Sequence, residues 1–227
     1  MYEYNTRVGF SQTDVNHRMN VTEIIDAFQD CSCFHSDELG VGFDYLIPRD
    51  MVWVLNYWEL EFDRTPEYGE RLTVGTFPYE FKSFLGYRNF YLKDEKGDII
   101  VKANSLWTLM DWKKMRPTRP DEKILAAYEL SEKLDMEYGA RKIAIPENCE
   151  VTEEECIKVR KHHLDLNGHV NNGQYIKIAL SMIPQGIVYK RMRVEYRNQA
   201  HLDDIIYPVI YSQDGVYTIS LNDNETQ

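Results

Sequence analysis

The residues best suited to chemistry gather in one short stretch, which runs from Asp165 to Tyr175. It contains an Asp, three Asn, a His and a Tyr. Asp165, Asn167 and His169 are spaced two apart, so an extended backbone would point them to the same side. An imidazole exchanges protons near neutral pH, and a neighbouring carboxylate or amide can orient the ring or a water molecule. The stretch therefore suits general acid–base catalysis, and it also fits an Asn-rich turn that contains a histidine.

A helix is expected directly after this stretch. An apolar run from Ile176 to Ile183 ends at Pro184. Asn171 or Asn172 could cap its first turn, because a short amide side chain accepts from a free backbone N–H. The helix N-terminus carries partial positive charge, which favours an anion beside it. The pattern thus predicts hydrogen-bond donors close to the histidine.

The first half of the chain predicts one helix followed by strands. Apolar residues recur at helical spacing from Val21 to Leu39, with Asn20 and Glu23 resembling a capping box. Alternating or β-branched runs then predict strands at residues 52–63, 72–82, 86–93 and 98–110, and a shorter strand opens the chain at residues 4–11. One helix with antiparallel strands is typical of the α+β class.

The chain repeats itself. Asp14 to Asn20 aligns without gaps on Asp165 to Asn171, and Leu60 to Glu70 aligns on Val194 to Asp204. Two segments in the same order predict two copies of one helix-plus-sheet unit. In the second copy, strands are predicted after the turn at residues 205–212 and 216–221.

The two copies differ at the residue that matters for chemistry. His169 of the second copy corresponds to Arg18, which stays protonated and cannot act as a general base. His17 is one position out of register, so it would face the other way. We therefore expect the chemistry in the second copy, with the first free to shape a binding pocket.

The net charge of the chain disfavours some classes of binding partner. The chain has 37 acidic and 26 basic side chains, a formal net charge of −11. Nucleic acid and anionic membranes both reward a basic surface, so neither is expected as the main partner. The sequence has neither an apolar run long enough to cross a bilayer nor a basic leader followed by an apolar segment. We expect a cytoplasmic protein without membrane insertion.

No metal and no cofactor are expected. The adjacent His162 and His163 would diverge in a strand, and no acidic or thiol cluster completes a ligand set around them. The four cysteines lack paired metal-binding spacing, so reduced thiols are predicted.

These motifs resemble those of the acyl-acyl carrier protein (acyl-ACP) thioesterases, which are double hotdog-fold hydrolases of bacteria and plant plastids. In the second half the similar segments are Asp165-x-Asn167-x-His169-Val-Asn-Asn172-x-x-Tyr175 and Val194-Glu195-Tyr196-Arg197. In the first half they are Phe28-Gln-Asp-Cys-x-x-x-His35-Ser36, Trp53-Val-Leu55, Pro66-x-x-Gly69-Glu70 and Asn104-Ser105-Leu-Trp107-x-x-Met-Asp111. The resemblance runs from about residue 4 to residue 221.

The resemblance implies an α+β protein of two tandem hotdog units, each a long helix wrapped by an antiparallel sheet, packed as a pseudo-dimer. The expected boundaries are residues 1–112 for the acyl-pocket unit, 113–149 for a connector and 150–227 for the catalytic unit. Only two strands follow the turn of the second copy, so we expect it to lack its last strand.

The resemblance also implies hydrolysis of a fatty acyl thioester on the phosphopantetheine arm of acyl carrier protein, by water attack assisted by His, Asp and Asn. The expected catalytic residues are Asp165, Asn167, His169 and Gln199. The expected substrate-binding residues are Asn172, Gly173, Tyr175, Ile24 and Phe28. Plant members have a Glu-Cys pair where this chain has Gln199 and Ala200, which excludes a cysteine nucleophile at that site.

Other functions stay open on the sequence alone. An acyl-coenzyme A thioesterase of the hotdog class would share the motif, and a hotdog dehydratase fits the Asn-rich surroundings less well. A non-catalytic acyl-binding module is the third alternative, since Gln199 cannot take a proton as Glu does. Acyl chain length and the choice between monomer and homodimer are also open. Two basic runs, around Lys113 to Arg119 and Lys190 to Arg197, are candidate docking patches for the acidic carrier.

Overall fold

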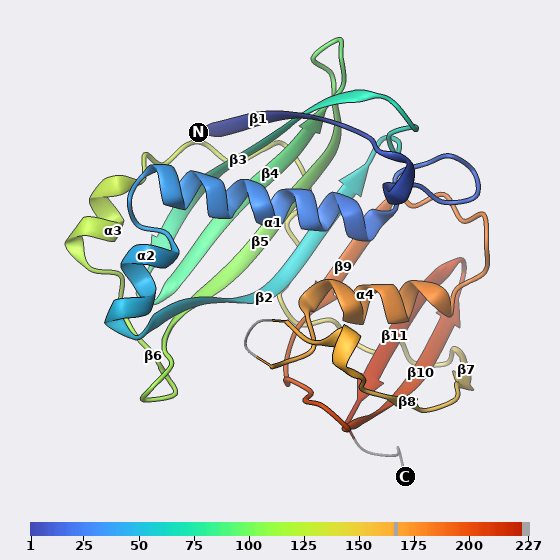
Figure 1. Ribbon diagram of the computed structural model, residues 1–227. Coiled ribbons are helices and arrows are strands. Elements are labelled where there is room, and N and C mark those ends of the chain that lie inside the picture. The colour runs from blue at the N-terminus through green and yellow to red at the C-terminus, as the bar shows by residue number, and fades with distance from the viewer. Residues whose placement is uncertain (166–167, 224–227) are drawn as a thin grey trace. The chain divides into compact units, whose positions relative to one another are not determined.

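The chain divides into two units, each built from a helix and an antiparallel sheet (Figure 1). A computed structural model describes residues 1–165 and 168–223. The first unit contains Met1–Arg141 and Tyr189–Glu195, and the second contains Lys142–Val188 and Tyr196–Gln227.

The sheet of the first unit has seven antiparallel strands in the order β1-β3-β4-β5-β2-β9, with β6 paired to β5. Their bounds are β1 (Tyr2–Arg7), β2 (Met51–Phe62), β3 (Arg71–Lys82), β4 (Leu85–Lys93), β5 (Ile99–Asp111), β6 (Arg116–Pro117) and β9 (Arg191–Glu195). The four long strands lie within two residues of their predicted bounds. The last strand, β9, follows helix α4 (Asn172–Ser181) in the chain and pairs with β2.

The long helix α1 (Val21–Glu38) lies along one face of this sheet (Figure 1). Its apolar stripe is fully buried at Ile24 and Phe28. The ring of Phe28 packs 5.3 Å from that of Phe90 and 6.3 Å from that of Trp58, measured between centroids. Burying one such aromatic ring stabilises the fold by about 1.5–3 kcal/mol. The helical spacing in the sequence therefore encodes the main core of this unit.

The predicted capping box at the start of α1 is wrong. Asn20 is the N-cap residue, but its side chain accepts no bond from the helix. Its Nδ2 donates instead to the carbonyl of Gln12, at 3.1 Å. A tertiary contact thus replaces the local one.

A satellite core lies around two short helices of the first unit, α2 (Phe43–Leu46) and α3 (Glu122–Ala127). Its buried members are Val41, Leu46, Leu109, Ile124 and Tyr128.

The other face of the sheet is covered by residues 131–139, which we call the strap. Backbone N–H groups of the strap donate to side chains of the sheet: Leu134 to Asn89 Oδ1 at 3.2 Å and Gly139 to Glu59 Oε2 at 2.8 Å. Glu59 is fully buried and also accepts from the Tyr57 hydroxyl at 2.7 Å. Its ion pair with Arg191 joins β9 to the same network.

This network changes the interpretation of the basic run from Lys190 to Arg197 as a docking patch. Arg191 pairs with Glu59 and Glu137, and Arg193 bonds Tyr57 and the carbonyl of Ala140. Two cations of the second candidate docking patch therefore serve the fold.

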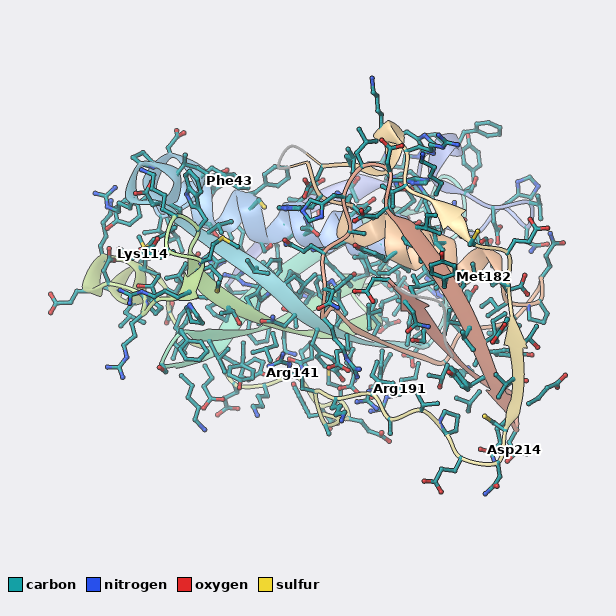
Figure 2. All side chains as sticks on the ribbon, turned by 90° about the horizontal axis from the view of Figure 1, so that it is seen from below. Phe43, Lys114, Arg141, Met182, Arg191 and Asp214 are labelled. Atoms are coloured by element: carbon teal, nitrogen blue, oxygen red, sulfur yellow. The ribbon has the colours of Figure 1, made fainter. Side chains whose placement is uncertain are left out.

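The second unit packs a shorter helix, α4 (Asn172–Ser181), with four strands. The strands are β7 (Glu150–Glu153), β8 (Ile157–Lys158), β10 (Ile205–Gln213) and β11 (Val216–Asn222), in the order β11-β10-β7 with β8 paired to β10. The buried core residues are Val159, Val170, Ile178 and Ile206. β10 and β11 turn at Asp214 and Gly215, both at positive φ, and Figure 2 shows Asp214 at the tip of this hairpin.

Candidate active site

The stretch around His169 folds as a tight corner. Leu164 and Val170 form an isolated β-bridge, and between them the N–H of Asp165 donates to the carbonyl of His169 at 2.8 Å. Gly168 sits at a φ of 78°, where glycine carries no steric cost. These contacts hold the described ends of the corner, Asp165 on one side and Gly168 to Val170 on the other.

The carboxylate of Asp165 helps to build this corner. Its Oδ1 accepts the backbone N–H of His169 at 3.2 Å. Asp side chains commonly stabilise turns in this way. Asp165 therefore has a structural part in aiming His169.

The first unit contains the same corner. Arg18 replaces His169: the N–H of Asp14 donates to its carbonyl at 2.8 Å, and its own N–H donates to Asp14 Oδ1 at 3.0 Å. His17 takes the positive φ of Gly168, at 60°. The two copies of the repeat thus share these backbone hydrogen bonds as well as their sequence pattern.

His169 is half-buried and faces a residue that the sequence did not single out. Its imidazole lies edge to face with that of His201, with ring centroids 4.9 Å apart and planes at 73°. Their backbones form an isolated β-bridge. The repeat alignment could have identified His201, because it places His201 opposite Glu67. In the first unit, Glu67 forms the equivalent bridge with Arg18 and an ion pair with it at 3.1 Å.

Asp204 holds His201 in place. Its Oδ2 accepts the backbone N–H of His201 at 2.7 Å and lies 3.6 Å from Nδ1 of the ring. Glu70 does the same for Glu67 in the first unit, accepting its N–H at 2.9 Å. Both copies thus use a carboxylate three residues later to fix this position.

Helix α4 begins beside the corner. Asn171 is its N-cap, and Asn171 Oδ1 accepts the N–H of Gly173 at 2.8 Å. The hydroxyl of Tyr196 donates to the carbonyl of Asn172 at 3.1 Å. Gly173 is buried, whereas Asn172 is partly exposed. Asn171 and not Asn172 is therefore the cap.

Tyr175 links this helix to the segment that carries Gln199 and His201. Its hydroxyl oxygen accepts the backbone N–H of Ala200 at 2.8 Å. Burial raises the pKa of Tyr175, so it stays a neutral phenol. Gln199 is exposed next to this anchor point.

The remaining predicted residues lie elsewhere. Ile24 and Phe28 belong to the first unit and are fully buried between α1 and its sheet. Asn167 lies outside the described residues. The second unit therefore brings together Asp165, His169, Asn172, Gly173 and Tyr175, with Gln199 on the adjoining loop.

Within residues 1–165 and 168–223, no three His, Cys, Asp or Glu side chains group as metal ligands. No helix in the same ranges is both long and apolar enough to cross a bilayer.

Solved structures confirm the fold. The chain superposes on an acyl-ACP thioesterase from Bacteroides thetaiotaomicron with a TM-score of 0.83 and 21% identity, covering 97% of both chains. A 12:0-ACP thioesterase from Umbellularia californica gives a TM-score of 0.80 and 18% identity, covering 97% of this chain and 92% of that one. The prediction of an α+β protein with tandem hotdog units is confirmed.

Sequence relatives point the same way. A chloroplastic acyl-acyl carrier protein hydrolase (FATB3) of Cuphea viscosissima is 24% identical over 209 residues, which cover 86% of this chain and 51% of that protein. Oleoyl-acyl carrier protein thioesterase 2 of Arabidopsis thaliana is 24% identical over 214 residues, covering 86% and 58%. The chain thus spans about half the length of the curated relatives it matches.

Family models match both halves of the chain in order. Residues 1–128 match the acyl-ACP thioesterase N-terminal domain, and residues 146–224 match the acyl-ACP thioesterase C-terminal domain. The chain belongs to the acyl-ACP thioesterase family.

Proposed function

We propose that this protein hydrolyses the thioester of a fatty acyl-acyl carrier protein and releases the free fatty acid. Membership of the family over both domains supports the substrate class. The observation that supports this chemistry is the comparison of the two equivalent corners. The second has an ionisable imidazole, His169, where the first has Arg18.

The proposed reaction is a direct attack by water. His169 takes a proton as the water oxygen bonds to the thioester carbon, giving a tetrahedral oxyanion. Collapse of this intermediate breaks the carbon–sulfur bond, and the imidazolium returns the proton to the departing phosphopantetheine sulfur. The products are a fatty acid and a thiol. Asp165 supports this chemistry by fixing the backbone of His169.

The start of α4 is the proposed donor site for the oxyanion. The N–H of Gly173 already donates to Asn171 Oδ1, so the N–H of Asn172 is the better candidate for that role. The dipole of the ten-residue helix adds to its effect. The exposed amide of Gln199 is proposed to position the water or donate to the same oxygen, and Asn167 to orient the water or the imidazole.

The acyl chain is proposed to bind against α1 of the first unit, at Ile24 and Phe28. The apolar character of that interface supports this placement, since Ile24, Phe28 and Trp58 are all fully buried there. A hydrocarbon chain is compatible with such a lining because it needs no hydrogen-bond partner. An acyl chain would enter by displacing these aromatic rings.

A paired substrate assay tests the proposal. Purified protein would be given medium- and long-chain acyl-ACP and the matching coenzyme A esters, and released thiol and fatty acid would be measured. We expect a higher kcat/KM on the ACP esters. Preference for the coenzyme A esters would support that alternative instead. Binding of acyl-ACP without turnover by folded protein would indicate a non-catalytic acyl-binding module.

A further inference from the structure

We propose that His201, held by Asp204, is a positioning residue for His169 in the hydrolysis reaction. The inference rests on the proposed function and adds a residue to it. The sequence suggested only near neighbours of His169 for this role, namely Asp165 and Asn167.

The geometry of the pair is the first argument. The backbones of His169 and His201 form a β-bridge, so their side chains leave the chain side by side. Their rings meet edge to face at 4.9 Å between centroids. Aromatic rings prefer this arrangement, because the positive edge of one meets the electron-rich face of the other. The contact restricts the rotation of the His169 ring.

The first unit supplies the second argument. The equivalent bridge there joins Arg18 and Glu67, whose side chains form an ion pair at 3.1 Å. The fold therefore uses this bridge to pair side chains in both copies. In the second copy the cation and the carboxylate are replaced by two imidazoles, so the pairing is kept while its chemistry changes.

The position of Asp165 is the third argument. Its Oδ1 accepts the backbone N–H of His169 at 3.2 Å, as Asp14 does for Arg18. That role belongs to the corner itself and is the same in the first copy, which has Arg18 in place of His169. The group in ring contact with the His169 imidazole is His201.

These contacts define what His201 does. When His169 takes a proton from the attacking water, the edge-to-face contact with His201 keeps its ring in one orientation. Asp204 Oδ2 lies 3.6 Å from Nδ1 of His201 and accepts its backbone N–H, which keeps the ring facing His169. His201 itself exchanges no proton with the substrate.

The test compares kcat and KM of acyl-ACP hydrolysis in matched variants. We expect His201→Ala to lower kcat by roughly 10-fold, because misplacing a reacting group by an ångström or less is enough for such a loss. KM should stay within about twofold, since uniform substrate binding is untouched. His201→Phe keeps an aromatic ring at the bridge and should recover part of the kcat. Glu67→Ala removes the matched residue of the first unit and should leave kcat unchanged. An unchanged kcat in His201→Ala would overturn the proposal.

A second measurement separates this proposal from the proposed function. In protein labelled with ¹⁵N-histidine, the ring signals of His169, assigned by their loss in His169→Gln, should shift in His201→Ala and stay in place in His162→Asn. Unshifted His169 signals in His201→Ala would overturn the positioning role. A wild-type protein that hydrolyses no thioester would instead overturn the proposed function, while the ring signals would still report the pairing.

Discussion

The hydroxyl oxygen of Tyr175 accepts the backbone N–H of Ala200 at 2.8 Å. This bond fastens the first turn of α4 to the loop whose next residues are Gln199 on one side and His201 on the other. One phenol thus sets the distance between the helix N-terminus and two proposed site residues.

Tyr175→Phe should therefore impair catalysis more than folding. It leaves the Ala200 N–H without its acceptor, at a cost of about 1 kcal/mol in the free energy of unfolding. Release of the loop should lower kcat by up to roughly 10-fold. Tyr4→Phe is the matched control, because it also removes one phenol bonded to a helix, but at the carbonyl of Ala27 in α1 of the first unit. Urea unfolding and steady-state kinetics would check both, and equal kcat in the two variants would contradict the assignment.

His169→Ala should lower kcat by about 10²–10⁴-fold, the usual contribution of a positioned general base. Arg18→Ala changes the corresponding residue of the first unit and should keep kcat near the wild-type value. Circular dichroism of both variants would establish that they are folded. Wild-type turnover in folded His169→Ala would exclude this residue as the base.

Asp14 and Asp165 should contribute similarly to stability, because each accepts a backbone N–H within the same kind of corner. We expect the alanine variants to lose about 1–2 kcal/mol each in the free energy of unfolding. Asp165→Asn keeps an acceptor oxygen and should recover most of this loss, together with most of the kcat that Asp165→Ala loses. A stable Asp165→Asn protein without turnover would instead show that the carboxylate charge is needed.

His35 should make the first unit sensitive to acid. Burial lowers the pKa of His35 to about 3 from its ordinary 6.5, and Arg88, whose Nη1 lies 3.1 Å from Nδ1, adds to this effect. The unfolded chain then binds more protons than the folded one between these two values. The free energy of unfolding therefore falls as the pH drops through about 6.5.

Urea unfolding at about pH 7 and about pH 5 measures this contribution, because carboxylates such as Glu59 and Glu70 have lowered pKa values and contribute only below their ordinary 4.5. His35→Gln should reduce the difference between the two pH values, whereas replacing the exposed His162 with Asn should preserve it. An undiminished difference in His35→Gln would assign the pH sensitivity to other groups.

Glu59→Gln should be destabilising. Burial alone raises the pKa of Glu59, but bonds from Arg191, Tyr57 and the Gly139 N–H outweigh it and hold the pKa below its ordinary value. The variant weakens these bonds, but Arg191 is partly exposed and keeps its ion pair with Glu137, so we expect a loss of about 1–3 kcal/mol in the free energy of unfolding. Glu137→Gln removes the other, exposed partner of Arg191 and should cost less than about 1 kcal/mol. Thermal unfolding would rank the two.

Local patterns predicted most of the secondary structure. The apolar spacing from Val21 to Leu39 gives a helix that ends at Glu38, and alternation places the four long strands of the first unit. The patterns failed where tertiary contacts determine the ends or the pairing of a strand. The opening strand runs from Tyr2 to Arg7 and not over residues 4–11, and residues 10–12 form a 3-10 turn. The partner of β9 could not be read either, since a strand's own alternation does not specify which sheet it joins.

The site was predictable only in part. His169 and its neighbours are close in sequence, so spacing and the comparison with Arg18 could single them out. His201 was missed because a β-bridge to a distant residue leaves no local signal, and only its alignment with Glu67 marked it. The use of the Gly173 N–H by Asn171 also depends on backbone geometry that residue types do not encode.

The hydrogen bonds of the strap depend on some side chains and not on others. Leu134, Glu137 and Gly139 are held through their backbone N–H groups, which almost any amino acid can provide. Their acceptors are specific side chains of the sheet, namely Asn89, Glu61 and Glu59. We therefore expect these three backbone hydrogen bonds to survive most changes of side chain in the strap but not the loss of their acceptors. Gly139 is the exception, because an added Cβ would lie 3.1 Å from both Glu59 and Arg193.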